Sequence, residues 1–476
     1  MKVLFAASEA VPFVKTGGLA DVIGSLPKEL IKQGAEVRVI MPKYEDIPDI
    51  YKNKMETIHT QTVSLGYRKQ YCGLQRLEVD GILFYFIDNE FYFRRRGLYG
   101  YGDEAERYAF FGRAVLEVLP FLDFVPEVIH CHDWQTGMIP VLLKTHFAWD
   151  QTYQPIKTMF TIHNLKYQGI FDRELLKDVF SLGDDLFSLD GLEHHGNGSC
   201  LKGGLVYADL ITTVSKTYAR EIQTAEYGEN LDGVLRKRSG QIHGIINGID
   251  NELYDPMTDS SIYMNYRNSL VKKRENKLGL QREYNLPVRK DVPLIGIVTR
   301  LVQQKGLDLI ERILDELLLL DVQLIVLGTG ERKYEELFKD AAYRYPDKVS
   351  AHIWFNDGLA RKIYAASDLF LMPSHFEPCG IGQLLALRYR TLPIVRETGG
   401  LKDTVQPYNK FTGEGTGFSF TNYNAHEMFF TIKAALELYK NDEVWSAIIK
   451  NINKVDYGWN KSAKQYISLY EKMIRL

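Results

Sequence analysis

Residues 2–42 read KVLFAASEAVPFVKTGGLADVIGSLPKELIKQGAEVRVIMP, and the pattern within them decides the fold. The apolar run at 2–7 is typical of a buried parallel strand. Apolar residues at helical spacing follow from Gly18 onward, and Gly34 is placed to end that helix. The run at 36–42 predicts a second strand. The stretch is therefore a strand–helix–strand unit, whose crossover makes the two strands parallel.

The same alternation continues through the first half of the chain. Helical patterns alternate with several apolar runs that we expect to be strands: ILFYFID (82–88), VIHCHD (128–133), KTMFTIHN (157–164), LITTVS (210–215) and IIN (245–247). These runs predict a doubly wound α/β domain over residues 1–246.

A second doubly wound domain is predicted from 247 to 457. It follows the turn-rich NGIDNELYDP at 247–256, and PLIGIVTRLVQQKGLDLIERIL at 293–314 repeats the order strand, loop, helix. Further strands are expected in VQLIVLGTG (322–330), VSAHIWF (349–355), DLFLMPS (368–374) and LPIVRETGG (392–400). The last residues, 458–476, predict one amphipathic helix.

Composition restricts the class of protein. The 476 residues are too many for one core, and a formal charge of −3 gives no electrostatic case for a nucleic-acid binder. The longest apolar stretch, at 313–328, contains Asp315, Glu316 and Asp321, so no membrane span is expected. Four widely spaced cysteines without a CxxC predict neither a zinc site nor a disulfide framework. We expect a soluble, cytoplasmic protein.

The pattern TGGL-x-D occurs twice, at 16–21 and at 398–403. Both copies are expected where a strand passes into a helix, because glycine lets the backbone turn closely and exposes amide groups there. Lys15 precedes the first copy and makes it a candidate anion site, with a capped helix and a solvated lysine as the alternative. Glu397 precedes the second copy, whose amides alone are expected to serve a sugar or a phosphate.

Two other stretches carry charged residues at expected strand ends. Arg300 and Lys305, in TRLVQQKG at 299–306, suit a diphosphate, unless the loop merely carries solvated charges. Glu377, in SHFEPCGIGQLLAL at 374–387, can accept sugar hydroxyls while the amides after it face a phosphate. A carboxylate that complements the helix dipole is the alternative for Glu377.

Histidines occur in two of the expected strands, at 128–133 and 157–164. His163 and Asn164 end the run TIHN, and a lone histidine is more often structural than catalytic. His130 and His132 share a face of their expected strand, yet no second cluster of metal ligands follows, so no metal is expected. The chain contains no GxGxxG after the first strand, no P-loop and no GxSxG. Dehydrogenase, P-loop kinase and serine hydrolase activities thus lose their main support.

The ordered motifs KTGGLADV, HCHDW, TIHN, NGID, TRLVQQKG, EPCG, TGGLKDTV and GTGF resemble those of bacterial glycogen synthases and plant starch synthases. The resemblance covers nearly the whole chain. It implies a GT-B fold, in which two doubly wound domains face a deep cleft and the helix at 458–476 returns to the first domain. It also implies retaining transfer of glucose from ADP-glucose to the non-reducing end of an α-1,4-glucan, with no cofactor and no metal.

The resemblance further implies which residues form the site. Lys15 and Gly18 would meet the donor's phosphate and sugar. Arg300 and Lys305 would stabilise the departing diphosphate, and the main-chain carbonyl of His163 would lie beside the anomeric carbon. The remaining substrate-binding positions are Glu377 with the amides of Cys379 and Gly380, then Asp21, Asp133, Asn164, Asn247, Ile381, and Phe355 against the adenine. Ile381-Gly382 departs from the family's usual Leu-Thr, which removes a hydroxyl near the nucleotide.

Three alternatives stay open. A glucan phosphorylase would need a pyridoxal phosphate lysine, and the GTGNMK-type stretch around it is absent. A transferase with a UDP-sugar donor is poorly excluded by sequence. A catalytically inactive glucan-binding regulator is disfavoured because Lys15, His163, Arg300, Lys305 and Glu377 are all present.

Overall fold

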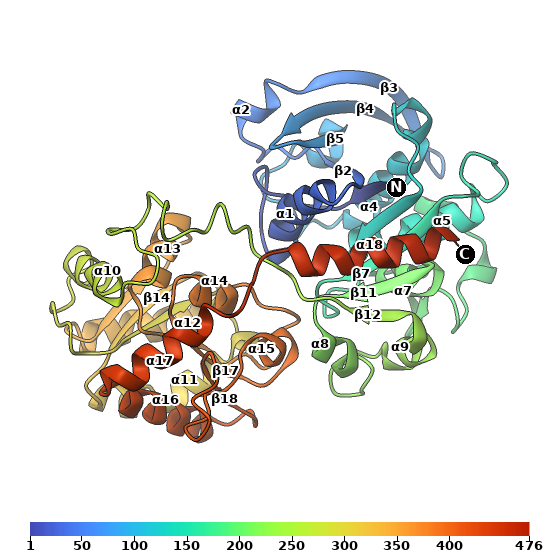
Figure 1. Cartoon of the computed structure of the whole chain (residues 1–476). Helices are drawn as coiled ribbons and strands as arrows, with labels where there is room; N and C mark the ends of the chain where they lie inside the picture. The colour runs from blue at the N-terminus through green and yellow to red at the C-terminus, as the bar shows by residue number, and fades with distance from the viewer. Residues whose placement is uncertain (476) are drawn as a thin grey trace. The chain divides into compact units, whose positions relative to one another are not determined.

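The computed structural model describes residues 1–475, and the chain divides into two compact units. Unit 1 comprises Met1–Asn247 together with the chain from Trp459 onward, and unit 2 comprises Gly248–Gly458. Both units are coloured along the chain in Figure 1. Within the described residues, no helix has both the length and the apolar character to cross a membrane.

Unit 1 is built on a nine-stranded sheet in the order β12-β11-β7-β6-β1-β2-β5-β4-β3. The strands from β12 to β5 pair in parallel, which confirms the doubly wound prediction for this part of the sheet. The strands are β1 (Lys2–Ala6), β2 (Glu36–Pro42), β3 (Glu56–Leu65), β4 (Arg68–Val79), β5 (Ile82–Asp88), β6 (Val128–His132), β7 (Lys157–Ile162), β11 (Leu210–Thr213) and β12 (Ile242–Gly244).

The sheet of unit 1 differs from the predicted one at both edges. β3 and β4 form an antiparallel hairpin that no predicted strand covers, because polar residues interrupt both strands and leave no continuous apolar run. At the other edge, the strand predicted at 245–247 is wrong. The strand that pairs with β11 is β12, three residues earlier, where His243 breaks the apolar pattern.

Helices cover this sheet, and a small sheet of β8 (Ile170–Phe171), β10 (Asn197–Ser199) and β9 (Glu193–His194) lies within the same unit. The helices are α1 (Gly18–Lys32), α2 (Asp49–Lys52), α3 (Glu90–Phe93), α4 (Glu104–Glu117), α5 (Met138–Thr145), α6 (Arg173–Phe180), α7 (Cys200–Tyr207), α8 (Lys216–Glu221), α9 (Asp232–Lys237) and α18 (Asn460–Arg475).

The last helix of the chain, α18, belongs to unit 1 and packs against α1, although it is coloured red and α1 blue in Figure 1. Its buried residues Ala463, Tyr466, Tyr470 and Met473 recur three or four positions apart, as on one face of an amphipathic helix. The Tyr470 hydroxyl also lies 2.7 Å from Nδ1 of His130, which is on β6 in the interior of the sheet. The core of unit 1 therefore includes residues from both ends of the chain.

Unit 2 is built on a six-stranded sheet in the order β15-β14-β13-β16-β17-β18, and every pair in it is parallel. The strands are β13 (Leu294–Val298), β14 (Gln323–Leu327), β15 (Val349–His352), β16 (Leu369–Met372), β17 (Leu392–Arg396) and β18 (Phe418–Phe420). The helices are α10 (Leu270–Glu283), α11 (Leu307–Leu319), α12 (Arg332–Arg344), α13 (Asp357–Ala366), α14 (Gly382–Arg388), α15 (Gly399–Thr404), α16 (Ala425–Tyr439) and α17 (Asp442–Ile452). The second doubly wound domain is thereby confirmed, with β18 as one strand more than predicted.

In both units the predicted site residues follow the carboxyl ends of parallel strands. The loops after β1, β6 and β7 lie at one edge of the unit 1 sheet, and those after β13, β16 and β17 at the corresponding edge of the unit 2 sheet. Doubly wound sheets bind ligands at this edge.

Candidate active site

The loop after β1 is organised by a carboxylate that the sequence did not reveal as a site residue. Glu9 is buried, and its Oε2 accepts hydrogen bonds from the amide and the hydroxyl of Thr16, each at 2.7 Å. These bonds tie the KTGG segment back to the end of β1. Burial, the largest cause, raises the pKa of the Glu9 carboxyl, and the nearby Asp21 raises it further.

Lys15 and Asp21 are brought together by the start of α1. The Nζ atom of Lys15 lies 2.7 Å from Oδ1 of Asp21, and Gly18 is the exposed first residue of the helix between them. The lysine keeps about a third of its side chain exposed. It can therefore exchange its carboxylate partner for a ligand phosphate at small cost, as is usual for a surface ion pair.

Asp133 follows β6 directly and has a backbone φ of 57°, which is uncommon for a residue other than glycine. Its Oδ1 accepts hydrogen bonds from the amides of His163 at 2.7 Å and Asn164 at 3.4 Å. Burial raises the pKa of the Asp133 carboxyl to about 7. Strained backbone and a perturbed acid together are typical of functional sites.

The side chain of His163 is paired with another histidine. Its Nε2 lies 3.0 Å from Nδ1 of His132, and both rings are buried. Burial lowers the pKa of His163 to about 3, so the ring is neutral at physiological pH. His130, two residues before His132, instead contacts Tyr470 and Thr161. In residues 1–475 no three His, Cys, Asp or Glu side chains are arranged to hold a metal ion.

Two predicted asparagines complete the set in unit 1. Asn164 is half-buried, and its Oδ1 accepts a hydrogen bond from the amide of Lys166 at 3.1 Å. Asn247, the last residue of the unit's first segment, is buried. Its Oδ1 has no hydrogen-bond partner in the described part of the chain. A buried unsatisfied carbonyl of this kind is the feature that a bound hydroxyl would relieve.

In unit 2 the predicted cation and the predicted carboxylate are partners. Lys305 Nζ lies 2.7 Å from Oε2 of Glu377, which also accepts a hydrogen bond from Ser374 Oγ at 2.9 Å. The loops meet closely because Gly306, with φ +73°, has no side chain: a Cβ there would lie 2.1 Å from the carbonyl oxygen of Pro373. Ser374 is thus a further residue of the site.

Arg300 follows β13 and is exposed. Among the described residues, no side chain forms an ion pair with its guanidinium. Phe355, after β15, is 71% exposed. Both residues have the accessibility that their predicted ligand contacts require.

In the second TGGL-x-D copy, Gly400 supports the Glu377 loop. The amide of Gly400 donates to the carbonyls of Glu377 and Pro378, both at 3.1 Å, so the prediction that this amide serves a sugar or phosphate is wrong. A Cβ on Gly399 would lie 1.9 Å from the carbonyl oxygen of Glu377. Arg396, the last residue of β17, is buried and donates to the carbonyl of Ser374 at 3.0 Å.

The segment after Glu377 turns sharply into α14. Gly380 has φ +74°, and Gln383 Nε2 donates to the carbonyls of Cys379 and Gly380 at 2.9 and 3.0 Å. Ile381 precedes the first residue of α14, Gly382. A Cβ on Gly382 would lie 3.1 Å from the Phe370 ring and 3.3 Å from Met372 Sδ. The departure from threonine at this position therefore matches the packing of β16 in this chain.

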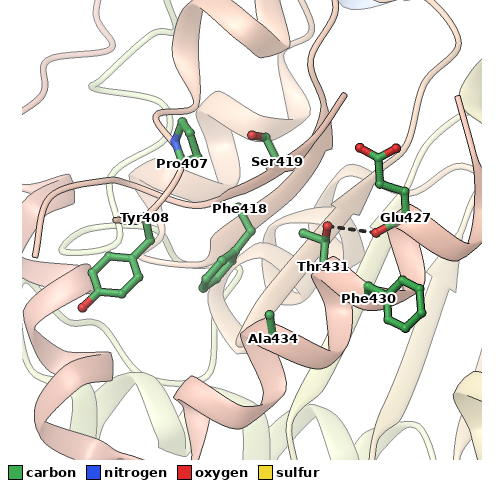
Figure 2. A pocket seen from close by; sticks show the side chains of 8 residues that line it. All are labelled: Pro407, Tyr408, Phe418, Ser419, Glu427, Phe430, Thr431 and Ala434. Carbon is green, nitrogen blue, oxygen red and sulfur yellow. Dashed lines mark hydrogen bonds between the residues drawn. The ribbon is translucent and has the colours of Figure 1, made fainter. Parts of the chain in front are cut away.

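The site residues do not coincide with the hollow in Figure 2, which has a volume of about 360 Å³ and lies between β18 and α16. Its lining residues are Pro407, Tyr408, Phe418, Ser419, Glu427, Phe430, Thr431 and Ala434. The Thr431 hydroxyl there donates to the Glu427 carbonyl (Figure 2), and the Ser419 hydroxyl donates to Glu397. The candidate site is therefore recognised by its chemistry and not by cavity size.

The residues missed by the sequence analysis are Glu9, His132 as a partner of His163, and Ser374. Glu9 carried a weak signal, since it is a carboxylate three residues after the end of β1. The sequence context of His132 suggests only a metal ligand, a role that lacks a second cluster. Ser374 carried no signal, because its role depends on a carboxylate oriented by tertiary contacts.

Comparison with known proteins gives consistent results over the full chain. Residues 2–237 match the family model described as starch synthase catalytic domain, and residues 283–452 match that of glycosyl transferases group 1. The chain is 57% identical to a glycogen synthase from Desulforamulus reducens and 56% identical to one from Clostridioides difficile. The first alignment covers 100% of this chain and 99% of the relative; the second covers 99% of each.

Solved structures agree. The catalytic domain of starch synthase IV from Arabidopsis thaliana, bound to ADP and acarbose, superposes with a TM-score of 0.93 at 32% identity. That match covers 100% of this chain and 99% of the other. A sucrose-phosphate synthase from Thermosynechococcus elongatus, at 17% identity and a TM-score of 0.62, shares the fold.

Proposed function

We infer the reaction from one premise: the chain belongs to the family of bacterial glycogen synthases and is a glycosyltransferase with the GT-B fold. It transfers glucose from ADP-glucose to the non-reducing end of an α-1,4-glucan, retains the configuration at the anomeric carbon and releases ADP. The observation that carries this proposal is the arrangement in unit 2. There, Lys305 with its carboxylate partner and Arg300, which has no ion pair within residues 1–475, follow β13. The buried carboxylate of Glu377 follows β16, the neighbouring strand of the sheet.

The cations stabilise the leaving group. Breaking the anomeric C–O bond places negative charge on the diphosphate, and preorganised positive groups lower the barrier to that step. Arg300 is exposed and can bind phosphate oxygens bidentately. Lys15, an accessible residue of unit 1, is the further cation that the family resemblance assigns to the diphosphate. Lys305 has two acceptors in this proposal: Glu377, which it already contacts, and the diphosphate of the donor. Donor binding lets the lysine contact the diphosphate while Glu377 accepts hydrogen bonds from the glucose hydroxyls and the amides of Cys379 and Gly380 donate to the hydroxyl oxygens.

On the sugar side, His163 contributes without adding charge. Positive charge develops on the anomeric carbon, and an imidazolium there would oppose it. Burial keeps the ring neutral, and Asp133 holds the main chain at His163, whose carbonyl offers partial negative charge to the sugar. The acceptor hydroxyl attacks from the face that the diphosphate leaves, and the leaving phosphate takes its proton. The configuration is thereby retained.

The proposal includes no cofactor and no metal, because the cations named above neutralise the diphosphate. The partners are ADP-glucose and an α-1,4-glucan such as glycogen, and we propose that the enzyme acts in the cytoplasm. A UDP-sugar donor is the alternative. In our proposal, the contact of Phe355 with the adenine and the contacts of residues 379–382 with the nucleotide select ADP over UDP.

A donor panel tests the proposal. Purified enzyme receives ADP-, UDP- or GDP-glucose with a glucan primer and EDTA, and radiolabelled glucose in the polymer is counted. We expect incorporation from ADP-glucose that EDTA does not reduce. Loss on chelation with recovery by Mg²⁺ would contradict the metal-free mechanism, and preference for UDP-glucose would contradict the donor. If glucose is incorporated from none of the three donors, the protein is a glucan-binding regulator. Phosphate-dependent release of glucose 1-phosphate would indicate a phosphorylase.

A further inference from the structure

A buried hydrogen bond joins two histidines at the ends of neighbouring strands. β6 ends at His132, β7 ends one residue before His163, and His132 lies opposite Thr161 in the sheet register. The 3.0 Å contact between His132 Nδ1 and His163 Nε2 crosses between these strand ends. A neutral imidazole has one donor and one acceptor nitrogen, so only two arrangements of the hydrogens are possible.

The second nitrogen of His132 decides between the two arrangements. His132 Nε2 is buried and has no hydrogen-bond partner in residues 1–475. If His163 donated the hydrogen bond, His132 would carry its own hydrogen on Nε2, as a buried N–H without an acceptor. If His132 Nδ1 donates, Nε2 keeps only a lone pair. Buried N–H groups without acceptors are the rarer and costlier defect, so His132 is the donor.

The tautomer of His163 follows directly. Because its Nε2 accepts, its hydrogen must be on Nδ1. That atom has no hydrogen-bond partner within the described chain and is not among the enclosed unsatisfied atoms, and the residue keeps 9% of its surface exposed. The ring therefore presents a donor to the open side of the site.

We propose that His132 is a positioning residue that holds the His163 ring in the Nδ1–H tautomer, so that the site offers the bound sugar a hydrogen-bond donor rather than an acceptor. This rests on the proposed glucosyl transfer, in which His163 contacts the reacting sugar. Consecutive residues share the task of holding His163: His132 binds the ring, and Asp133 binds the main-chain amide at 2.7 Å. A change at His132 should therefore alter the ring while leaving the main chain anchored.

Three variants of the full-length enzyme test the positioning role. His132→Phe keeps a flat ring and removes the donor, whereas His132→Asn keeps an amide donor close to the Nδ1 position. Tyr470→Phe is the matched control, since Tyr470 belongs to the same buried network but contacts His130 and not His163. We expect kcat with ADP-glucose and glucan to fall about tenfold in His132→Phe, with KM within twofold, and to recover largely in His132→Asn. Tyr470→Phe should lower the thermal midpoint and leave kcat unchanged.

A spectroscopic readout separates this inference from the proposed reaction. ¹⁵N chemical shifts of labelled histidine in the ligand-free enzyme report which nitrogen of His163 is protonated. We expect Nδ1–H in the wild type and a mixture of tautomers in His132→Phe. If His132→Phe does not fold, the wild-type shifts and the kcat of His132→Asn still decide.

Three results would overturn the inference: Nε2–H in wild-type His163, wild-type kcat in His132→Phe, or a kcat loss in Tyr470→Phe as large as in His132→Phe. A wild-type enzyme that uses no ADP-glucose would instead contradict the proposed function, and the tautomer measurement would stand unchanged.

Discussion

At the scale of single residues, burial gives the charged groups of the site different properties. Arg300 is exposed, whereas Lys305 and Glu377 form a largely buried pair that Ser374 completes. Removing an exposed cation costs little stability, while removing one partner of a buried pair leaves an uncompensated charge. Residues with the same proposed catalytic role should therefore respond differently to substitution.

Arg300→Ala and Lys305→Ala should each lower kcat about 100-fold, because charge on the leaving diphosphate grows toward the transition state. Only Lys305→Ala should also destabilise the protein, by about 2 kcal/mol. The buried Glu377 carboxylate would lose its cationic partner and keep only the hydrogen bond from Ser374. Steady-state kinetics and thermal unfolding of both variants check this. Unchanged kcat with raised KM would assign these residues to ground-state binding, and equal midpoints would mean that the Lys305–Glu377 pair adds no stability.

The raised pKa of Asp133 predicts that the stability of the protein falls as the pH rises. Burial raises its pKa from the ordinary 3.8 to about 7, so the folded protein binds this proton more tightly than the unfolded chain. The stabilisation is fully present below about pH 4 and is lost as the pH rises to about 7, a change of about 4 kcal/mol. Asp133→Asn does not titrate and still accepts the His163 amide.

The stability of Asp133→Asn relative to wild type should therefore increase between pH 4 and 7 and stay constant above. Denaturant unfolding of both proteins at four pH values measures this difference. His163, whose pKa is lowered to about 3, contributes in the opposite direction between pH 3 and 6.5, but equally in both proteins. Parallel stability curves for the two proteins would show that Asp133 ionises freely.

At the scale of elements, the repeated TGGL-x-D motif shows how one sequence pattern serves two structures. The first copy starts α1 after a long loop, and Gly17 has an extended backbone with φ −153°. The second copy starts α15 two residues after β17, and Gly399 has φ +45°. The first loop is held by Glu9 and presents Lys15, whereas the second packs under the backbone of the Glu377 loop.

Gly399→Ala should displace the Glu377 loop, because the added Cβ would lie 1.9 Å from a backbone oxygen. We expect a large loss of kcat together with a lower thermal midpoint. Gly413→Ala is the matched control: Gly413 also has a positive φ, +71°, but a Cβ there meets no atom of the described residues within 4 Å. The control should cost about 1 kcal/mol of stability and no activity. Equal effects of the two substitutions would mean that backbone strain alone, and not the contact with Glu377, is responsible.

At the scale of the whole molecule, the two units differ in continuity. Unit 2 is one uninterrupted segment, whereas unit 1 needs α18 from the end of the chain. The helix covers the sheet with Tyr466 and Tyr470 and supplies the partner of buried His130. Ser462 also donates a hydrogen bond to the carbonyl of Ile246, so the two segments of unit 1 meet where the chain leaves it.

Residues 248–458 expressed alone should fold and unfold cooperatively. Residues 1–247 alone should not, because apolar surface and a buried histidine lose their cover. Joining residue 247 to residue 459 by a short glycine–serine linker should restore folding of unit 1. Circular dichroism and thermal melts of the three fragments test this. A folded 1–247 fragment would show that α18 is dispensable for the core.

The sequence alone determined the features that depend on local periodicity and on ordered motifs. Runs of apolar residues located most parallel strands, the helical spacing after Gly18 located α1, and Gly34 ended it with φ +93°. Apolar runs do not reveal polar strands, as in the β3–β4 hairpin, or a short edge strand such as β12. The resemblance of the motifs predicted the charged residues of the candidate site, because a motif is recognised by residue type and order alone.

Only the tertiary structure decided which of these residues are partners. Lys305 and Glu377 are 72 positions apart, and His132 and His163 are 31 apart, so no local pattern relates them. They meet because parallel pairing brings the carboxyl ends of neighbouring strands to one edge of each sheet. Burial at that edge then sets the pKa of Asp133 and the neutrality of His163, and desolvation exists only once the chain has folded.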